Sequence, residues 1–241
     1  MESSNNPLVS VLIPVWGDYL KYLPRCLASV NKQTYENIEI IVVESETSVP
    51  KAINKGIELA EGKYITHVGA DDTLYPSKIE KQVKVMEKYP FYSLCACWLE
   101  DTRFNMKRVG KIKPIVGYTE MLKAFNYSSG STYMWRKKYN ERYDESLPSG
   151  QDYDFALKLA KHGLAACIPE VLVKQFSTPG QISTNWGKKI RGIYILAKKY
   201  GEDYSIVDWM KVAGLLGLYF SAYFLGIRVY KFITYAKEKY E

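Results

Sequence analysis

Short apolar runs alternate with helix-forming segments along the first part of the chain. Apolar, largely β-branched runs lie at residues 9–13, 38–43, 64–68 and 92–99. Segments with helical spacing or helix-capping residues lie between them, at 20–32, 48–61 and 77–88. Apolar strands of this kind suit a parallel sheet covered on both faces, and their alternation with helices is typical of βαβ units. We therefore predict an α/β fold whose ligand binds outside the carboxyl ends of the strands.

Beyond residue 100 the pattern is less regular, and we expect a mixture of short strands and helices. The predicted strands are 103–111, 131–136, 165–168 and 171–176, and the predicted helices are 118–125 and 151–161. From Trp186 onward the residue pattern is typical of helices. We expect one catalytic domain over residues 1–187 and a separate helical region over residues 188–241.

The composition and the charge narrow the classes of function. Of the 241 residues, 47% are apolar and 24% are charged, which excludes a disordered polyelectrolyte and a collagen-like repeat. The formal net charge is +7, but residues 188–241 carry +5 of it and the preceding 187 residues only +2. The four cysteines lack paired CxxC spacing, so we expect buried thiols in a reducing compartment, and the polar N-terminus predicts no export.

Two acidic pairs are the candidate chemical groups. Asp71 and Asp72 follow the third predicted strand, where two carboxylates repel each other unless a cation is near. They either form a helix-capping turn or bind a hard divalent cation together with substrate phosphates. Asp152 and Asp154 open a later helix, where they either compensate the helix dipole or supply a general base at Asp152. No glycine-rich dinucleotide or P-loop motif is found, which disfavours those two kinds of site.

Seven short motifs follow one another along the chain. They are VSVLIPVW (9–16), IIVVE (40–44), AINKG (52–56), AEGKYI (60–65), ADD (70–72), YDES (143–146) and GQDYDF (150–155). In this order and spacing, over about residues 8–183, the chain resembles inverting glycosyltransferase family 2. The resemblance implies a GT-A fold, in which helices flank a single Rossmann-like mixed sheet. It also implies transfer of a sugar from a nucleotide-diphosphate donor, preferentially a UDP-sugar, to a hydroxyl group.

The resemblance implies a set of donor-binding residues, one position at a time. Pro14 would form the floor of the nucleotide pocket, and Trp16 would lie against the base, on which a flat ring stacks well. The alternative for Trp16 is a core aromatic residue at a strand end. Glu44 occupies the position of a carboxylate that contacts the base or the ribose. The implied donor-binding residues are Pro14, Trp16, Glu44, Asn54, Ala70 and Asp71.

The resemblance also implies a metal ion and a catalytic base. Asp71, together with Asp72, would bind Mg²⁺ or Mn²⁺, and Asp152 would deprotonate the acceptor hydroxyl. The chain departs from the family pattern at two places. Gly69 stands where the first acidic residue of the metal motif is usual, and residues 177–179 stand where a histidine is common. We therefore expect the metal ion to bind more weakly than in typical members of the family.

These departures leave alternatives open. His67, inside a predicted strand, and His162, at a helix end, are interpreted as structural residues that do not replace the missing histidine. One alternative function is a catalytically impaired, membrane-bound scaffold that binds nucleotide-sugars. Another is a nucleotidyltransferase on the same fold, which the lack of a glycine-rich, basic phosphate loop disfavours.

The C-terminal region combines positive charge with an apolar segment. Residues 212–227 are uncharged and lie between Lys211 and Arg228. The segment is shorter than the roughly 20 residues of a membrane span. Aromatic and basic flanks favour an in-plane membrane anchor, with a core or dimer helix and a true span as alternatives. We therefore expect a glycan or lipid-linked acceptor at the cytoplasmic face of the cell membrane, a possible homo-oligomer, and no nucleic-acid partner.

Overall fold

The chain forms two compact units in the computed structural model. The described residues are 6–44, 48–102, 108–110, 113–124, 128–178 and 185–225. The first unit comprises Met1–Glu145 and Asp152–Thr178, and the second comprises Ser146–Gln151 and Pro179–Glu241. The contacts therefore divide the chain after Thr178, whereas the sequence suggested a division after residue 187. They also group the short segment that precedes Asp152 with the second unit.

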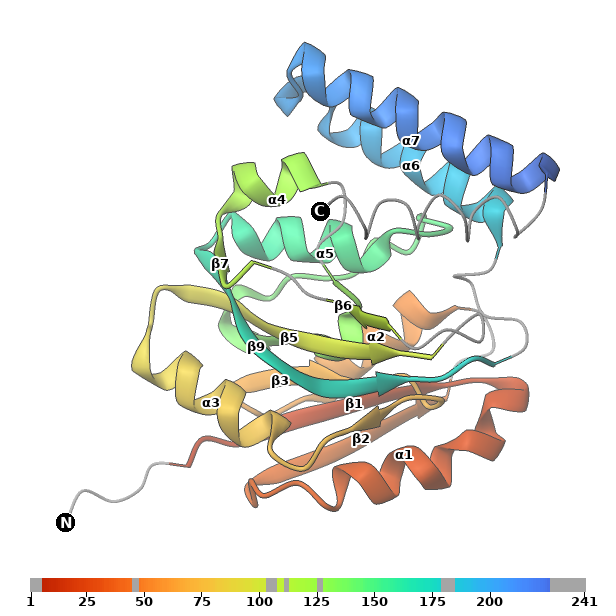
Figure 1. The fold of residues 1–241 in the computed structure, drawn as a ribbon. Helices are drawn as coiled ribbons and strands as arrows, with labels where there is room; N and C mark the ends of the chain where they lie inside the picture. The colour runs from red at the N-terminus through yellow and green to blue at the C-terminus, as the bar shows by residue number, and fades with distance from the viewer. Residues whose placement is uncertain are drawn as a thin grey trace. The chain divides into compact units, whose positions relative to one another are not determined.

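Among the described residues, the first unit is built on a nine-stranded mixed sheet (Figure 1). The strands are β1 (Val9–Val15), β2 (Ile38–Glu44), β3 (Tyr64–His67), β4 (Thr73–Leu74), β5 (Tyr92–Asp101), β6 (Arg108–Gly110), β7 (Ile115–Val116), β8 (Met134–Arg136) and β9 (Leu164–Gln175). Their order is β2-β1-β3-β8-β5-β9-β4, with β6 beside β5 and β7 beside β9. The β1–β2, β1–β3 and β5–β9 pairs are parallel and the others are antiparallel, which confirms the predicted mixed sheet.

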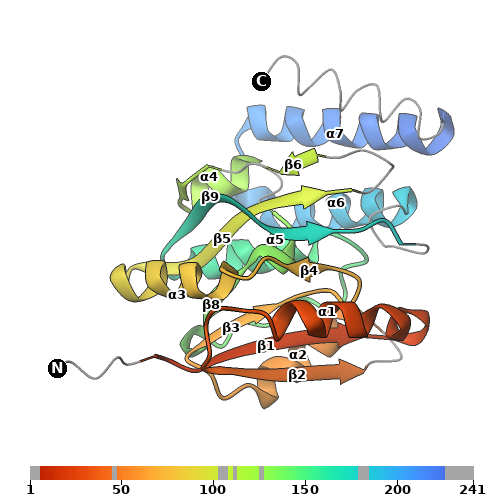
Figure 2. The ribbon, with the colours of Figure 1, turned by 60° about the horizontal axis from the view of Figure 1, so that its bottom comes forward.

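Helices cover both faces of this sheet. They are α1 (Leu23–Val30), α2 (Val49–Leu59), α3 (Lys78–Lys88), α4 (Tyr118–Ala124) and α5 (Gln151–Ala160). Alternate side chains of β1, such as Val11 and Ile13, enter a core with α1 and α3. Leu12 points to the other face, where its methyl groups lie 3.1 Å from the position a Cβ would take at Gly56 of α2. Figure 2 shows α1 and α2 on opposite sides of β1.

Two sequence predictions about strands are wrong in detail. The segments 165–168 and 171–176 form the single strand β9, because Cys97 pairs with Ile168 and Trp98 with Val171, which leaves Pro169 and Glu170 as a bulge. Proline has no N–H to donate to a neighbouring strand, so an interruption there is expected. The predicted strand 131–136 begins instead with a 3-10 helix at Gly130–Thr132, and only β8 is extended. The expected strand 103–111 is described only over β6, and its other residues lie outside the described ones.

The pairing of β1 with β3 ends just before Pro14. β3 pairs with β1 as far as His67 and Leu12, and the last backbone bond runs from the Val68 N–H to the Leu12 carbonyl at 3.0 Å. The backbone groups of successive residues point alternately to the two neighbouring strands, so the nitrogen of Pro14, like the carbonyl of Leu12, points toward β3. Proline cannot donate there, and the chain after β3 leaves the sheet. This divergence carries Asp71 and Asp72 away from β1 at its carboxyl end.

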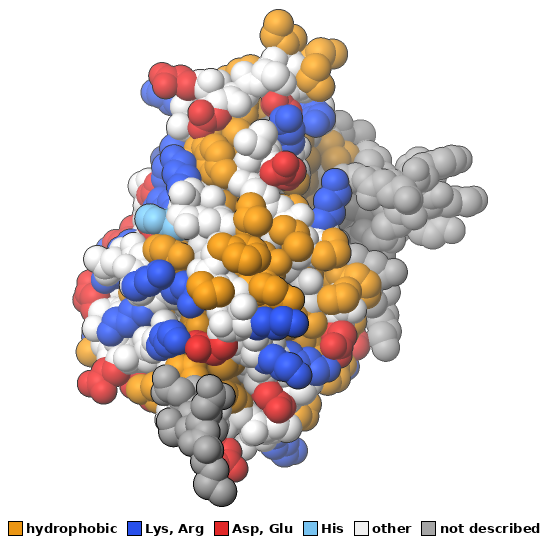
Figure 3. Space-filling model, turned by 90° about the vertical axis from the view of Figure 1, so that its left-hand side faces the viewer, with side chains coloured by type: hydrophobic (Ala, Val, Ile, Leu, Met, Phe, Trp, Pro, Cys, Tyr) orange, Lys and Arg blue, Asp and Glu red, His pale blue; other side chains and the backbone are white. Residues whose placement is uncertain are grey.

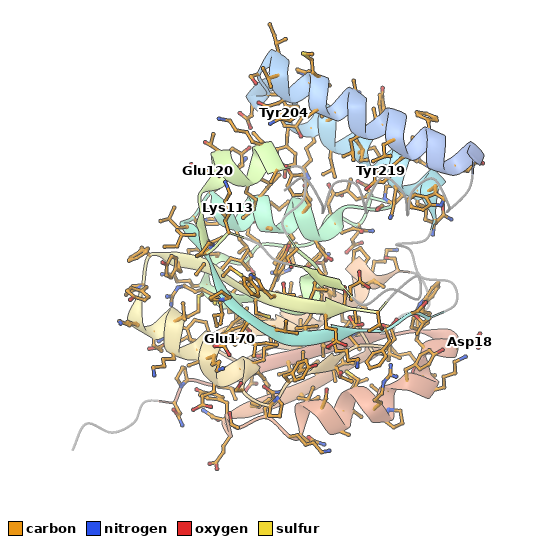
Figure 4. All side chains as sticks on the ribbon, in the orientation of Figure 1. Asp18, Lys113, Glu120, Glu170, Tyr204 and Tyr219 are labelled. Atoms are coloured by element: carbon orange, nitrogen blue, oxygen red, sulfur yellow. The ribbon has the colours of Figure 1, made fainter. Side chains whose placement is uncertain are left out.

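The second unit contains a helical hairpin, formed by α6 (Trp186–Tyr200) and α7 (Ile206–Leu225). The Trp186 and Tyr219 rings lie 5.7 Å apart, which makes the two helices antiparallel; Tyr219 is labelled in Figure 4. Gly192 of α6 packs against Ser149, whose carbonyl would be 2.5 Å from a Cβ at that glycine. Within the described residues, no helix has the length and apolar character needed to cross a bilayer. The end of the predicted apolar segment, residues 226–227, lies outside the described ones.

A lysine is completely buried in the first unit. Lys78 opens α3 with no exposed surface, and its Nζ donates to the Thr66 hydroxyl at 2.8 Å. Burial lowers the pKa of this ammonium group from 10.5 to about 8, because the charged form loses its hydration. The unfolded chain therefore binds more protons than the folded chain between these two values. It follows that the cost of burying Lys78 is greatest below this range and declines as the pH rises through it.

We predict that Lys78→Met raises the free energy of unfolding by about 2 kcal/mol near pH 6, because methionine has a similar volume and no charge to desolvate. The gain should shrink near pH ~10, where the buried lysine of the wild type is already neutral. Denaturant unfolding of both proteins at the two pH values measures the difference. An equal gain at both values would contradict the assignment of the cost to the ammonium charge.

Candidate active site

The carboxyl ends of three parallel strands bring several of the predicted site residues to one edge. β1 ends before Trp16, β2 ends at Glu44, and β3 leads into the turn that contains Asp71. Val15 pairs with Glu44 in the sheet, so the ends of β1 and β2 coincide. This edge is where ligands bind in open α/β sheets.

The donor-side residues predicted from the sequence differ in accessibility. Trp16 is 41% exposed, and its ring stacks on Tyr19 with 6.5 Å between centroids, so the alternative of a core aromatic is wrong. Glu44 is exposed, whereas Pro14 is buried within β1 and Ala70 is buried beside the acidic pair. An exposed indole that packs on a second aromatic ring is suited to stacking on a nucleobase.

Asp71 is buried, and two neighbouring side chains donate hydrogen bonds to it. Its Oδ2 accepts a hydrogen bond from the Thr178 hydroxyl at 2.6 Å. Its carbonyl accepts one from the Arg25 guanidinium at 2.5 Å, and its negative charge contributes to a raised pKa of Tyr19, after burial as the main cause. Thr178 belongs to the segment where the sequence suggested a missing histidine. A hydroxyl therefore contacts the predicted metal-binding carboxylate at that place.

Asp72 is also buried, and its Oδ2 accepts hydrogen bonds from the Ser131 hydroxyl at 3.0 Å and the Gln175 amide at 3.1 Å. Across the described ranges, no group of three or more His, Cys, Asp or Glu side chains could bind a metal ion by itself. Mg²⁺ commonly uses one or two carboxylates and takes its other ligands from phosphates and water. The adjacent carboxylates of Asp71 and Asp72 fit such a partial ligand set.

The predicted base, Asp152, lies at the start of α5 and is bonded to the 3-10 helix that contains Ser131. Its Oδ2 accepts a hydrogen bond from the Gly130 N–H at 2.9 Å, and the next residue, Ser131, bonds to Asp72. Burial is the main cause that raises the pKa of Tyr143, and the charge of Asp152 and a hydrogen bond to that carboxylate raise it further, so the hydroxyl lies next to Asp152. Two consecutive residues of one 3-10 helix thus connect the acidic pair and the predicted base, which lie far apart in the sequence.

Asn54 and Asp154 have partners other than a donor molecule. The Asn54 amide donates to the Tyr143 carbonyl at 3.0 Å and to Glu145 at 2.8 Å, and its oxygen accepts from the Tyr143 N–H at 2.8 Å. It therefore positions the segment that contains Tyr143. Asp154 is fully buried and forms an ion pair with Lys158 one helical turn later at 3.0 Å. Asp154 is therefore paired with a lysine within α5, whereas Asp152 accepts a hydrogen bond from Gly130.

Burial and negative charge determine the protonation states around the site. The pKa of Cys26 rises to about 12, mainly through burial and further through the charges of Asp72 and Asp71. Burial, followed by the charge of Asp152, raises the pKa of Tyr143 well above its ordinary value. Burial and, to a lesser extent, the Lys78 charge lower the pKa of His67 to about 3. At neutral pH the neighbours of Asp152 are therefore a protonated phenol and a neutral imidazole.

Sequence reasoning missed several residues of the site. Ser131 and Thr178 carry no motif, and the structure alone brings them to Asp72 and Asp71. Tyr143 is part of the YDES motif, but that resemblance implied no contact with the base. His67 was interpreted as structural, and its Nε2 lies 2.9 Å from the Tyr143 hydroxyl. All four cysteines are buried and free, as predicted.

Comparison with known proteins gives one family and many relatives. The model of the family described as Glycosyl transferase family 2 matches residues 10–49 and 46–148. An uncharacterized glycosyltransferase of Methanocaldococcus jannaschii is 25% identical over 211 residues, which are 73% of this chain and 73% of that protein. Another from Haemophilus influenzae is 26% identical over 256 residues, covering 85% and 79%. One from Rickettsia felis is 27% identical, but this chain spans only 32% of its length.

Solved structures show the same fold at low sequence identity. A crystal structure of residues 1–349 of S. aureus TarS with UDP-GlcNAc has a TM-score of 0.66 and 13% identity, covering 89% of this chain and 73% of that one. The mannosyltransferase PcManGT from Pyrobaculum calidifontis, with GDP-Man and Mn²⁺, has a TM-score of 0.56 and 14% identity, covering 88% and 70%. The fold is that of GT-A glycosyltransferases. Since the family model matches more than half of its length, the chain belongs to glycosyl transferase family 2 and is a glycosyltransferase.

Proposed function

We propose that this enzyme transfers a sugar from a nucleotide-diphosphate donor, preferentially a UDP-sugar, to a hydroxyl of a glycan or lipid-linked acceptor, with inversion. The main support is the turn at Gly130 and Ser131, which donates hydrogen bonds to Asp152 at 2.9 Å and to Asp72 at 3.0 Å. A base and a pair of metal-binding carboxylates in one site are the groups that a single displacement on a diphosphate-linked sugar requires.

The ligands of the structural neighbours support the donor class. TarS was crystallised with UDP-GlcNAc, and PcManGT with GDP-Man and Mn²⁺. In this chain Trp16 would stack on the base, and Glu44 would accept a hydrogen bond from the base or the ribose. Asp71 and Asp72 would bind Mg²⁺ or Mn²⁺, which supplies positive charge to the departing diphosphate. Arg25, which donates to the Asp71 carbonyl, adds a second positive charge on this side.

The proposed reaction is one displacement at the anomeric carbon. Asp152 accepts the proton of the acceptor hydroxyl as the hydroxyl oxygen attacks the carbon. The new carbon–oxygen bond forms on the face opposite the bond to the diphosphate, which breaks and takes its electron pair with the leaving group. One displacement without a covalent enzyme intermediate inverts the configuration. The Gly130 N–H and the Tyr143 hydroxyl fix the carboxylate of Asp152 in place for this step.

We predict that two substitutions separate the base from the donor site. Asp152→Asn should lower the rate of transfer about 10²–10⁴-fold, the usual contribution of a general base, and leave donor affinity nearly unchanged. Asp71→Ala should instead weaken the Mn²⁺-dependent binding of the donor. Turnover assays and thermal-shift titrations with UDP-GlcNAc and GDP-mannose, with and without Mn²⁺, measure the two effects.

Glu170→Gln provides a matched control. Glu170 is an exposed carboxylate in the bulge of β9, and it forms an ion pair with Lys81 of α3. It should change neither turnover nor donor affinity. Equal losses of turnover and donor affinity in Asp152→Asn would exclude Asp152 as the base. Full turnover in that variant would exclude the proposed mechanism as a whole.

We also propose that the α6–α7 hairpin binds the cytoplasmic face of an anionic membrane. Between the helices lies an apolar groove of about 490 Å³, whose lining includes Ile190, Arg191, Tyr194, Leu216, Phe220 and Tyr223. On α7, Ile206 is 82% exposed and Met210 is 68% exposed. α6 contributes five cationic residues and no acidic one: Lys188, Lys189, Arg191, Lys198 and Lys199. Exposed apolar side chains beside cations suit a surface of anionic lipid headgroups.

We predict that Ile206→Asp combined with Met210→Asp releases the enzyme from vesicles. Two carboxylates on the exposed side of α7 would have to lose hydration and approach anionic headgroups, which is unfavourable. Flotation with phosphatidylglycerol–phosphatidylcholine vesicles measures the bound fraction, which should fall at least about tenfold if each exposed side chain contributes its apolar burial.

The control places the same charges on exposed apolar residues of the first unit. Phe91 and Ile115 are each 54% exposed, and Figure 3 shows hydrophobic side chains gathered among lysines and arginines on one face of the molecule. Phe91→Asp combined with Ile115→Asp should float as the wild type does. If the α7 variant still floats but changes from a dimer to a monomer in solution, the hairpin is a homo-oligomer interface and the membrane proposal is wrong.

A further inference from the structure

We propose that His67 and Tyr143 are positioning residues for Asp152, linked in one direction by two hydrogen bonds. His67 donates its Nε2–H to the oxygen of the Tyr143 hydroxyl, and that hydroxyl donates its own proton to the Asp152 carboxylate. The inference rests on the proposed role of Asp152 as the base. It adds two residues to the reaction that none of the sequence motifs assigned to it.

The three side chains are close and rigidly packed. His67 is 5% exposed and Tyr143 is 3% exposed, and His67 Nε2 lies 2.9 Å from the Tyr143 hydroxyl. The Tyr143 ring stacks on Phe155 with 4.2 Å between centroids, and the His67 ring meets Trp135 edge-on at 6.2 Å. Side chains that are buried between aromatic rings keep one rotamer. The hydroxyl of Tyr143 is therefore held at one position between the imidazole and the carboxylate.

The direction of the hydrogen bonds follows from a count of protons. A carboxylate can only accept, so the single proton of the Tyr143 hydroxyl goes to Asp152. The hydroxyl oxygen can then only accept from His67, which requires the proton on Nε2. Independently, the buried Nδ1 of His67 has no hydrogen-bond partner among the described residues. A buried N–H without an acceptor is rare, so the proton is again assigned to Nε2.

Asp152 receives a second hydrogen bond from a residue that must be small. The Gly130 N–H donates to its Oδ2 at 2.9 Å. A Cβ at Gly130 would lie 2.3 Å from His67 Nε2 and 2.5 Å from Asp152 Oδ1, so only glycine leaves room for both side chains. Two donors from different elements, the 3-10 helix and the segment before α5, therefore fix the orientation of the carboxylate.

The charges around the network keep it in one protonation state at neutral pH. Burial and the Lys78 ammonium group lower the pKa of His67 to about 3, so the imidazole is neutral. Burial raises the pKa of Tyr143, and the negative charges of Asp152 and Asp154 and the neighbouring Tyr133 raise it further. The imidazole thus orients the phenol while it stays neutral. It adds no positive charge that would disfavour the transfer of the acceptor's proton to Asp152.

The first test is the tautomer of His67, which needs no substrate. The chain has two histidines, so His162→Gln assigns their signals in a long-range ¹H–¹⁵N correlation spectrum of the full chain. We expect the neutral Nε2–H form of His67 from about pH 5 to 8, and a shifted Nε2 signal in Tyr143→Phe. A neutral Nδ1–H form, or titration of His67 within this range, would overturn the proposal.

The second test is the effect on turnover of UDP-GlcNAc and GDP-mannose with Mn²⁺. Tyr143→Phe should lower kcat about 10- to 100-fold, as expected for loss of one hydrogen bond to a charged group, with the donor KM within about twofold of wild type. The acid limb of the pH profile should move to higher pH, because a carboxylate that has lost a donor binds its proton more tightly. His67→Leu should lower kcat, whereas His67→Gln, which retains an N–H donor at the same reach, should restore most of it.

Tyr35→Phe is the matched control for the loss of a buried hydroxyl. Tyr35 is 6% exposed, and its hydroxyl donates to the Pro7 carbonyl at 2.6 Å. It should lose some thermal stability and keep the kcat and pH profile of the wild type. The double variant Tyr143→Phe/His67→Leu should be no slower than Tyr143→Phe, because His67 acts through the tyrosine.

The outcomes distinguish this inference from the proposed function. If Asp152→Asn is inactive but Tyr143→Phe has the kcat and pH profile of the wild type, only the positioning role is wrong. Equal kcat losses in Tyr143→Phe and Tyr35→Phe would show a merely structural effect and also overturn it. If Asp152→Asn retains full turnover, the proposed function fails whatever the tautomer of His67.

Discussion

Three carboxylates gathered at one edge of a sheet repel each other, and the structure depends on the donors that make this arrangement tolerable. Asp71, Asp72 and Asp152 each accept a hydrogen bond from a neutral donor rather than relying on a cation alone. Neutral donors stabilise the charged form without cancelling the charge. The site therefore keeps the negative charge that the proposed metal ion and the proposed base both require.

The placement of these donors explains why the site forms only in the complete fold. The 3-10 helix at Gly130–Thr132 is bonded to α5 through the Gly130 N–H and to the turn after β3 through the Ser131 hydroxyl. Gln175, at the end of β9, supplies another donor to Asp72. Each contributing element is fixed by the core, so the geometry of the acidic groups depends on the packing of distant segments.

The sequence predicted the elements whose information is local. The β-branched runs of β1, β2 and β3 and the cap and proline of α2 mark those elements directly. The merging of two predicted strands into β9 could not be read, because a bulge at Pro169 depends on the partner strand β5. The acidic residues of the site could be proposed from their resemblance to a family. Thr178 could not, since it lies 107 positions from its partner Asp71 and carries no motif.

The proline in β1 has a consequence for which parts of the fold hold the acidic turn in place. The Val68 N–H is the last group of that chain segment bonded to β1, and beyond it the turn is closed by a bond from the Asp72 N–H to the Gly69 carbonyl at 2.9 Å. Between these two amides, the Gly69 N–H donates to the Ser131 hydroxyl at 3.3 Å and no longer to the sheet. Arg25 of α1, Ser131 of the 3-10 helix and Gln175 of β9 all donate hydrogen bonds to the acidic turn. The position of its carboxylates therefore depends on these three side chains rather than on the pairing of β1 with β3.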